Sequence, residues 1–441
     1  MKNVLVITFA FPPMSEVASV RPHGLAKYLP QHGWNPIFLT PQLPGEPDGA
    51  FNVVQTEYDD IIRYWLKKLH ISIQKQEGEG ADPFSKDKLM RIYNTQKVPP
   101  TFKKIAFLPV EFLVYPDLDI GWYTYAVDAG NRICEQHAIA AIISTSKPNT
   151  THLIAHTLAK TYNIPWIADF RDLWTLNIFL DYSFIRKYFE KKLELHTIER
   201  ASALTTLSQP WADKLKEFHK KEHSYSVTNG FDPEMMNPGI PLSKKFRIVY
   251  TGTLYYGYQD PVQLFRVMSA LISSNQIDQE DISIEFYGGD NEWLETYISR
   301  YQLHDVVILH GRVPRETAIE EQRRSQLLLL LTWNEPGEDG VSTGKFFDYL
   351  AARRPILSIG FTNGGVENTL LKQTRAGKHF SDEDELERYL IQVYHEFKQK
   401  GFVSYYGIKE EIMKFSHLEM AKKFSQVLNQ SLESFPDKRE G

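Results

Sequence analysis

Short apolar runs alternate with amphipathic stretches along the whole chain. The runs at 327–331 and 356–359 consist mostly of Leu and Ile, which is typical of parallel strands buried on both faces. Between such runs, apolar residues recur every three or four positions and predict helices. The predicted strands cover residues 2–9, 35–40, 139–144, 165–170, 203–207, 225–228, 246–251, 282–287, 306–310, 327–331 and 356–359. The predicted helices cover residues 20–32, 120–137, 150–162, 184–201, 210–220, 261–274, 292–301, 314–325, 344–352, 382–400, 406–414 and 418–432. This alternation predicts an α/β protein built on parallel sheets.

The pattern is interrupted at residues 229–233, where Asn, Gly, Asp and Pro gather, and then starts again. A chain of 441 residues is long for one domain, so two domains are expected. We predict a Rossmann-like N-terminal domain at 1–235 and a Rossmann-like C-terminal domain at 236–400. Residues 401–441 are expected to form C-terminal helices that return to the N-domain.

Composition excludes several classes of protein. The net charge of −5 gives no basic field that would favour nucleic acid. Cys134 is the single cysteine, so neither a disulfide within the chain nor a cysteine-based zinc site is expected, and a reducing, cytoplasmic setting fits. No segment approaches the roughly 18 consecutive apolar residues of a membrane span. Basic and apolar residues mix at 67–71 and 103–108, which fits either contact with an anionic membrane surface or a helix packed on the N-domain.

The segment from Thr343 to Leu357 suggests a ligand. It follows the strand at 327–331 and passes through a turn into a helix, whose first N–H groups favour phosphate. Lys345 adds a positive charge, and Asp348, about one turn later, can accept hydrogen bonds from sugar hydroxyls. Phosphate and ribose together suggest a nucleotide. A hydride-transfer enzyme is disfavoured, because no Gly-x-Gly-x-x-Gly follows the first strand of either half.

A set of short motifs, in this order and spacing, resembles glycosyltransferase family 4 of the GT-B glycosyltransferases, in particular its bacterial surface-polysaccharide branch. The matching segments are 6–13, 21–29, 33–34, 115–117, 120–122, 144–148 with His152, 168–174, 228–232, 250–254, 286–289, 310–313 and 343–357.

The resemblance implies a GT-B fold, in which two Rossmann-like, doubly wound domains face a central cleft. It implies a retaining transfer of a sugar from a UDP- or GDP-linked donor to a hydroxyl of a glycan or lipid-linked acceptor, in cell-surface polysaccharide biosynthesis. The C-terminal domain would hold the donor and the N-terminal domain the acceptor. Neither a metal nor another cofactor would be required, because helix termini and basic side chains would neutralise the diphosphate.

The donor residues that the resemblance implies lie in the second half of the chain. The turns would lie beside the diphosphate, residues 312 and 313 would flank the base, and Asp348 would bind the ribose. These residues are Gly252, Thr253, Leu254, Gly288, Arg312, Val313, Glu338, Thr343, Gly344, Lys345 and Asp348.

The sequence departs from the family pattern at two places. Asp348 stands where many members have the second of two glutamates, and Gly340 stands where they have the first, with Glu338 and Asp339 nearby. The stretch 255–260 also lacks the base that many members place on the phosphates. Lys345, Arg312 and Arg171 are the candidates to replace it.

In the N-terminal half, Asp169, Arg171, Asp172 and His152 are the predicted catalytic residues, and Glu16 and Arg21 the predicted acceptor-side residues. Acids and a base at the carboxyl end of a strand usually face the ligand cleft in this architecture. An internal salt-bridge network is the alternative for the acids and Arg171. A structural histidine is the alternative for His152, and helix capping or surface charge for Glu16 and Arg21.

Two other functions stay open. A GT-B 2-epimerase acting on nucleotide-sugars would convert its substrate without an acceptor. An inactive GT-B subunit would bind a partner or a glycan without turnover, and the missing glutamate and phosphate base argue for it. The donor base, the sugar, the acceptor, the linkage and the oligomeric state are not indicated by the sequence.

Overall fold

The computed structural model describes residues 1–14, 17–68, 108–180, 182–289, 292–332, 340–360 and 365–435. The chain divides into two compact units: unit 1 comprises Met1–Val227 and Ala421–Gly441, and unit 2 comprises Thr228–Met420. The boundary therefore follows Val227, whereas the sequence prediction placed it after residue 235. Both units are α/β structures, as expected.

Unit 1 is built on a parallel sheet that has seven strands within the described residues, in the order β3-β2-β1-β4-β5-β6-β7. Its strands are β1 (Lys2–Thr8), β2 (Trp34–Pro41), β3 (Val53–Thr56), β4 (Ile139–Ser146), β5 (Trp166–Phe170), β6 (Ala203–Thr206) and β7 (Ser224–Ser226). The strand order changes direction between β1 and β4. Such a change is where ligands bind in doubly wound sheets, at the carboxyl ends of the strands.

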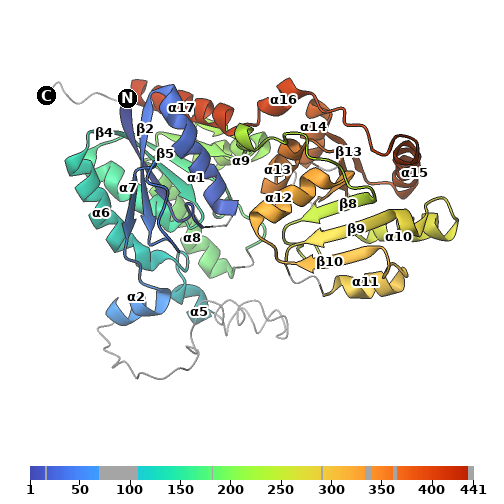
Figure 1. Ribbon diagram of the computed structural model, residues 1–441. Helices are drawn as coiled ribbons and strands as arrows, with labels where there is room; N and C mark the ends of the chain where they lie inside the picture. The colour runs from blue at the N-terminus through green and yellow to red at the C-terminus, as the bar shows by residue number, and fades with distance from the viewer. Residues whose placement is uncertain are drawn as a thin grey trace. The chain divides into compact units, whose positions relative to one another are not determined.

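The helices of unit 1 cover its sheet (Figure 1). They are α1 (Val17–Tyr28), α2 (Ile61–Lys68), α5 (Leu108–Leu113), α6 (Tyr123–Gln136), α7 (Thr150–Tyr162), α8 (Phe184–Ile198), α9 (Gln209–His219) and α17 (His417–Glu433), most of which belongs to this unit. Helix α17 lies beside α1, where the Arg21 guanidinium is 4.9 Å from the centre of the Phe424 ring. The last described helix thus packs on the first.

Helix α8 turns a charged face inward. Arg186, Glu190 and Glu194, spaced four residues apart, are all almost fully buried. Glu190 accepts a hydrogen bond from Trp174 Nε1 at 2.6 Å, and Glu194 accepts one from the Thr175 N–H at 2.9 Å. Burial raises the pKa of Glu190 to about 6, against the charge of Arg186. These carboxylates anchor the loop that leaves β5, which carries two of the predicted catalytic residues.

Unit 2 contains a parallel sheet that has six strands in the described part of the chain, in the order β10-β9-β8-β11-β12-β13. The strands are β8 (Phe246–Thr251), β9 (Ile282–Tyr287), β10 (Val307–Gly311), β11 (Leu327–Leu331), β12 (Ile356–Ile359) and β13 (Gly377–Phe380). Its helices are α10 (Val262–Ser273), α11 (Leu294–Arg300), α12 (Arg315–Arg324), α13 (Gly344–Ala352), α14 (Gly365–Thr374), α15 (Glu383–Lys400) and α16 (Lys409–Met413). The order changes direction between β8 and β11.

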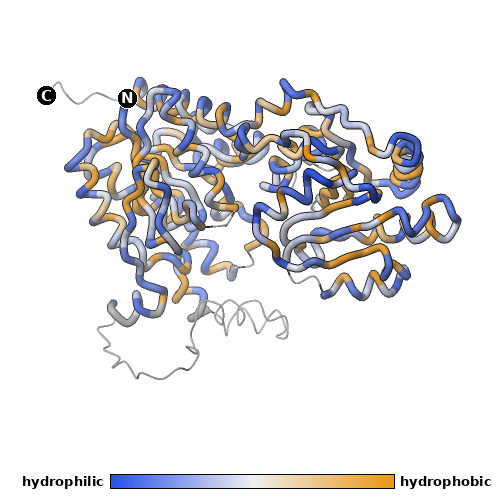
Figure 2. Tube along the Cα trace, in the orientation of Figure 1, coloured by the Kyte–Doolittle hydropathy of each residue, from blue (hydrophilic) through white to orange (hydrophobic). Residues whose placement is uncertain are grey.

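The five leucines of β11 serve two hydrophobic layers. Leu327, Leu329 and Leu331 pack in one layer with residues of α10, α11 and α15. Leu328 and Leu330 pack in the other, with residues of α13, α14 and α16. Side chains alternate between the two faces of a strand, so an uninterrupted apolar run fits a sheet covered on both faces. In Figure 2 the strands of this unit carry apolar stretches, while its helices alternate between polar and apolar residues.

The sequence predicted most of these elements and missed five. Strands β8, β9, β11 and β12 and helices α7 and α13 have the predicted bounds. Strand β3, helix α2, helix α5, helix α14 and strand β13 were not predicted. The helix predicted at 20–32 is α1 followed by a 3-10 turn at Leu29–His32, because Pro30 cannot continue an α-helix. The confirmed result is two doubly wound parallel sheets.

Among the described residues, no helix combines the length and apolar character needed to cross a bilayer. Residues 69–107 lie outside the described residues, and most of the mixed basic and apolar stretches at 67–71 and 103–108 falls among them. Contact with a membrane surface stays a prediction.

Candidate functional site

Two glycine turns meet at the carboxyl ends of the unit 2 strands. Gly252 follows β8 with φ +107°, and Gly288 follows β9 with φ +131°. The Gly252 N–H donates to the Tyr287 carbonyl at 2.7 Å, and the Gly288 N–H donates to the Gly311 carbonyl at 2.7 Å. A Cβ on Gly288 would lie 2.5 Å from the Gly252 carbonyl oxygen, closer than Cβ atoms approach other heavy atoms in proteins. The packing of the turns therefore requires glycine at 288.

Lys345 reaches the first of these turns from the start of α13. Its ammonium group lies 4.3 Å from the centre of the Tyr250 ring and donates to the Tyr250 hydroxyl. A Cβ on Gly252 would be 3.3 Å from Lys345 Cε, so the lysine lies along the turn. Burial lowers the pKa of Lys345 to about 8, against the opposing effect of Glu367. The structure thus brings Gly252, Gly288 and Lys345 together.

Thr343 is the N-cap residue of α13, with φ −83° and ψ 147°. Its N–H and its hydroxyl both donate to Oε1 of Glu367, each at 2.9 Å. Glu367 lies in the first turn of α14 and is 2% exposed. Burial raises its pKa, against the hydrogen bonds from Thr343 and the charge of Lys345. Sequence reasoning missed Glu367 because it missed α14; an acid in the first turn of a helix after a strand was the available signal.

Asp348 lies one turn further along α13 and pairs with Arg315, whose Nη2 is 2.8 Å from Oδ1. Burial raises the pKa of Asp348, against the opposing Arg315 guanidinium. Arg315 begins α12, directly after the loop that carries Arg312 and Val313. The sequence analysis did not single out Arg315, yet this side chain fixes the carboxylate of Asp348, the residue predicted to bind the ribose.

The remaining predicted donor residues differ in exposure. Arg312 is exposed on the loop after β10, and the side chain of Val313 packs against the core beside it. Thr253 is exposed, and its carbonyl accepts from the Tyr250 hydroxyl at 3.0 Å. Leu254 is buried in a core layer, so a contact with a donor would come from its backbone. Glu338 lies outside the described residues.

In unit 1, Asp169 holds Arg21 in a buried ion pair. Arg21 Nε and Nη2 donate to the two Asp169 oxygens at 2.9 and 2.8 Å, and both side chains are almost fully buried. The hydroxyls of Thr145 and Thr205 add bonds of 2.9 and 2.7 Å. Burial raises the pKa of Asp169, but the guanidinium and these hydrogen bonds together lower it below the usual value. These contacts match the internal network that was the alternative to a direct role for Asp169.

His152 lies buried near the same strand ends. Its Nδ1 is 2.7 Å from the Ser144 hydroxyl, which accepts a hydrogen bond from Trp166 Nε1 at 2.7 Å. Because burial lowers the pKa of His152 to about 3, the imidazole is neutral at physiological pH. Its Nε2 has no hydrogen-bond partner among the described residues.

Arg171 and Asp172 follow β5. Arg171 donates to the carbonyls of Ser146, Lys147 and Ala18, at 2.7, 2.9 and 2.8 Å. Its guanidinium therefore joins the loop after β4 to the start of α1. Asp172 is exposed. Glu16, the other predicted acceptor-side residue, lies outside the described residues.

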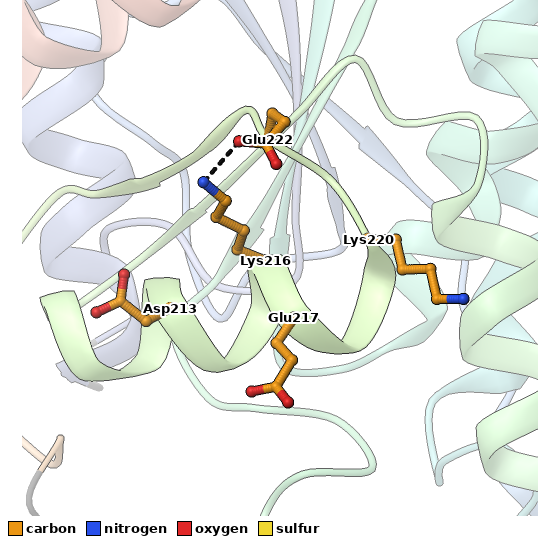
Figure 3. Close-up of a pocket in the computed structure, with 5 residues that line it drawn as sticks. All are labelled: Asp213, Lys216, Glu217, Lys220 and Glu222. Atoms are coloured by element: carbon orange, nitrogen blue, oxygen red, sulfur yellow. Dashed lines mark ion pairs between the residues drawn. The ribbon is translucent and has the colours of Figure 1, made fainter.

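A separate pocket of about 400 Å³ lies on α9 and the turn after it, as Figure 3 shows. Charged side chains line it, and Lys216 pairs with Glu222 at 2.6 Å. Its lining consists of Asp213, Lys216, Glu217, Lys220 and Glu222. None of the predicted site residues is among them, and all five lining residues are charged, whereas ligand pockets are usually lined mostly by hydrophobic and aromatic residues.

No protein-family model matches the sequence, and neither does any curated protein sequence. Solved structures do match. Sucrose-phosphate synthase from Thermosynechococcus elongatus aligns over 98% of this chain and 100% of its own, with a TM-score of 0.60 and 12% identity. HepE from Anabaena, solved with UDP and glucose, aligns over 98% and 100%, with a TM-score of 0.56 and 11% identity.

WaaG, described as a glycosyltransferase involved in lipopolysaccharide biosynthesis, aligns over 98% of this chain and 100% of its own. Its TM-score is 0.53 at 10% identity. Identities this low relate the folds and not the activities. With its two doubly wound parallel sheets, the chain has the fold of the GT-B glycosyltransferases.

Proposed function

We propose that this protein is a glycosyltransferase that moves a sugar from a UDP- or GDP-linked donor to a hydroxyl of a glycan or lipid-linked acceptor. One observation carries the proposal. The Lys345 ammonium, the Gly252 turn and the N-terminus of α13 lie together at the carboxyl ends of β8 and β11. That is the position at which doubly wound sheets bind nucleotides.

The first element of the proposal is the diphosphate. Backbone N–H groups at a helix N-terminus and at a glycine turn attract phosphate, and an ammonium adds a full charge. Lys345 would replace the base that is absent from residues 255–260. HepE, of similar fold, has been solved with UDP.

The second element is the nucleoside. Arg315 donates to Oδ1 of Asp348, and we assign Oδ2 to a ribose hydroxyl. Arg312 and Val313, on the same loop as Arg315, would flank the base. The ion pair with Arg315 favours the ionised form of Asp348 against the effect of burial, and the ionised carboxylate is the stronger acceptor for a hydroxyl.

The third element is the transfer itself. We propose a retaining reaction in which the leaving diphosphate assists the incoming hydroxyl on the same face of the sugar. The protein then supplies positioning and charge stabilisation, and helix N–H groups with Lys345 take the place of a metal ion. The Nε2 atom of neutral His152 would contact the transferred sugar. Asp172 would orient the acceptor hydroxyl, since both oxygens of Asp169 already accept hydrogen bonds.

We place this reaction in cell-surface polysaccharide biosynthesis, on the cytoplasmic side. The support is the motif resemblance of the sequence and the fold shared with WaaG. The acceptor would be the growing glycan or its lipid-linked precursor.

A thermal-shift panel of UDP, GDP, TDP and ADP tests the donor site, because a ligand that binds the folded state raises its melting temperature. The proposal expects selective stabilisation by one nucleotide. Incubation with the matching nucleotide-sugars then tests the reaction, and turnover that requires an acceptor supports a transferase. Conversion without acceptor would indicate the epimerase, and binding without turnover the inactive subunit. No stabilisation by any nucleotide would remove the donor site.

A further inference from the structure

The N-terminus of α13 has a capping residue that does not cap. Thr343 stands at the N-cap position in extended backbone conformation, where a threonine hydroxyl ordinarily accepts a hydrogen bond from the first turn of the helix. Within the described part of the chain, its side chain makes no such bond to α13. The hydroxyl proton and the N–H both go to Glu367 Oε1 instead.

Glu367 is well placed to hold that threonine. It is 2% exposed, so its carboxylate is fixed and shielded from water. Two hydrogen bonds of 2.9 Å to one oxygen direct the Thr343 hydroxyl toward α14 and away from the first turn of α13. The first-turn N–H groups, those of Gly344 and Lys345 among them, receive no side-chain cap from this residue.

We propose that Glu367 keeps the N-terminus of α13 open for the donor's diphosphate by holding the Thr343 hydroxyl away from the first-turn N–H groups. The inference rests on the proposed function, since it concerns the same diphosphate-binding site. Glu367 is a positioning residue, because it acts through Thr343. If Glu367 is removed, the hydroxyl is released and caps the helix, and it then competes with the diphosphate for the same N–H groups.

A buried carboxylate beside an anion seat would repel the anion if its charge were uncompensated. Here the groups in its field are Lys345 on α13, the Thr343 hydroxyl and N–H, and the phenols of Tyr250 and Tyr349. The two hydrogen bonds from Thr343 and the positive charge of Lys345 together offset the charge of the carboxylate. The carboxylate can therefore fix Thr343 without closing the site to phosphate.

The experiment uses the full chain and the nucleoside diphosphate that the panel selects, with the matching monophosphate as reference. Calorimetry measures both affinities for the wild type, Glu367→Ala, Thr343→Val and the double variant. Glu367→Gln is the matched control, because its amide oxygen can still accept both bonds from Thr343. In Thr343→Val there is no hydroxyl to cap the helix.

We expect Glu367→Ala to lower the affinity for the diphosphate by about fivefold, which corresponds to a typical N-cap interaction. The affinity for the monophosphate should fall by less than about twofold. Glu367→Gln should stay within about threefold of the wild type, and Thr343→Val gives the reference affinity of a helix start that has no hydroxyl. The double variant should regain the diphosphate affinity of Thr343→Val, because the competing cap is gone.

A double variant as weak as Glu367→Ala would overturn the inference, since it would mean that Glu367 acts through general packing. If Glu367→Ala fails to fold, Thr343→Val is the deciding variant. A loss of diphosphate affinity of tenfold or more in this variant would show that the hydroxyl binds the ligand directly, which would overturn the inference. A wild type that binds no nucleotide would remove the proposed function itself. If the wild type binds the nucleotide but the double variant does not regain affinity, only this inference is removed and the proposed function stands.

Discussion

The Lys345 ammonium lies 4.3 Å from the centre of the Tyr250 ring, on which it is held by a hydrogen bond to the phenol oxygen. Helix α13 thereby delivers its cation to the turn that follows β8. The aromatic face and the hydroxyl stabilise the ammonium in a half-buried position without neutralising its charge. A cation held in this way stays available to an anionic ligand.

Replacing Lys345 with Met is expected to lower the affinity for the selected nucleoside diphosphate about tenfold or more, because a charge-assisted contact is lost. The matching monophosphate should lose less. Calorimetry with both ligands measures the difference. Lys372→Met, an exposed lysine on α14, is the matched control and should leave both affinities unchanged.

Diphosphate affinity should fall as the pH rises through about 8, because Lys345, with its pKa lowered to about 8 by burial, loses its proton there. The phosphates themselves titrate near pH 6 and contribute little above pH 7. Lys345→Arg keeps its charge throughout this range and should give a flat profile. Affinities measured from pH 7 to 9.5 test both; a wild-type profile as flat as that of the arginine variant would contradict the assignment.

Asp348→Ala should lower the affinities for the nucleoside diphosphate and the monophosphate by the same factor, about tenfold, because the ribose is common to both ligands. Equal losses distinguish this residue from Lys345. The same titrations measure it. A loss confined to the diphosphate would place Asp348 at the phosphates and refute the ribose assignment.

Arg21→Met should destabilise the protein by about 3 to 5 kcal/mol, because it leaves the buried Asp169 carboxylate without its cation. The pair's contribution is present above about pH 4, where an unfolded aspartate is ionised, and is lost as the pH falls toward the lowered pKa of Asp169 in the folded protein. Urea unfolding at pH 7 measures the loss. Arg63→Met breaks an exposed pair with Asp60 and should change the stability by at most about 1 kcal/mol.

Gly288→Ala should disturb the donor site, since its Cβ would lie 2.5 Å from the Gly252 carbonyl oxygen. Gly239 also has a positive φ, but a Cβ there would meet nothing within 4 Å. Gly239→Ala therefore measures the conformational cost alone, about 1 kcal/mol. Thermal unfolding and nucleotide titration of both variants separate the two effects, and equal behaviour would show that the turns can move apart.

The apolar pattern was enough to predict the sheets, because each strand obeys a local rule. Leu327 to Leu331 can only be a buried strand or a buried helix segment, and the turns on either side decide for the strand. Helix α14 was missed because its buried positions include Glu367 and Thr374, which interrupt the apolar repeat. Strand β13 was missed because Gly377, Lys378 and His379 carry little strand preference.

The contacts of the site could not be predicted in the same way. Asp169 and Arg21 are 148 residues apart in the sequence, and no local pattern joins them. The sequence offered an internal network as one of two roles for Asp169, but it did not indicate which cation this carboxylate would hold. Glu367 and Arg315 likewise gain their significance from Thr343 and Asp348, which reach them only through the fold.

Strand β11 is a shared wall between two hydrophobic layers, and this has a consequence for how residues 228–420 come apart. Exposing either layer to water uncovers the leucines on one face of the strand and removes the support of those on the other face. We therefore expect the two layers of this region to unfold together, and local opening at the proposed nucleotide site to be confined to the loops around the sheet.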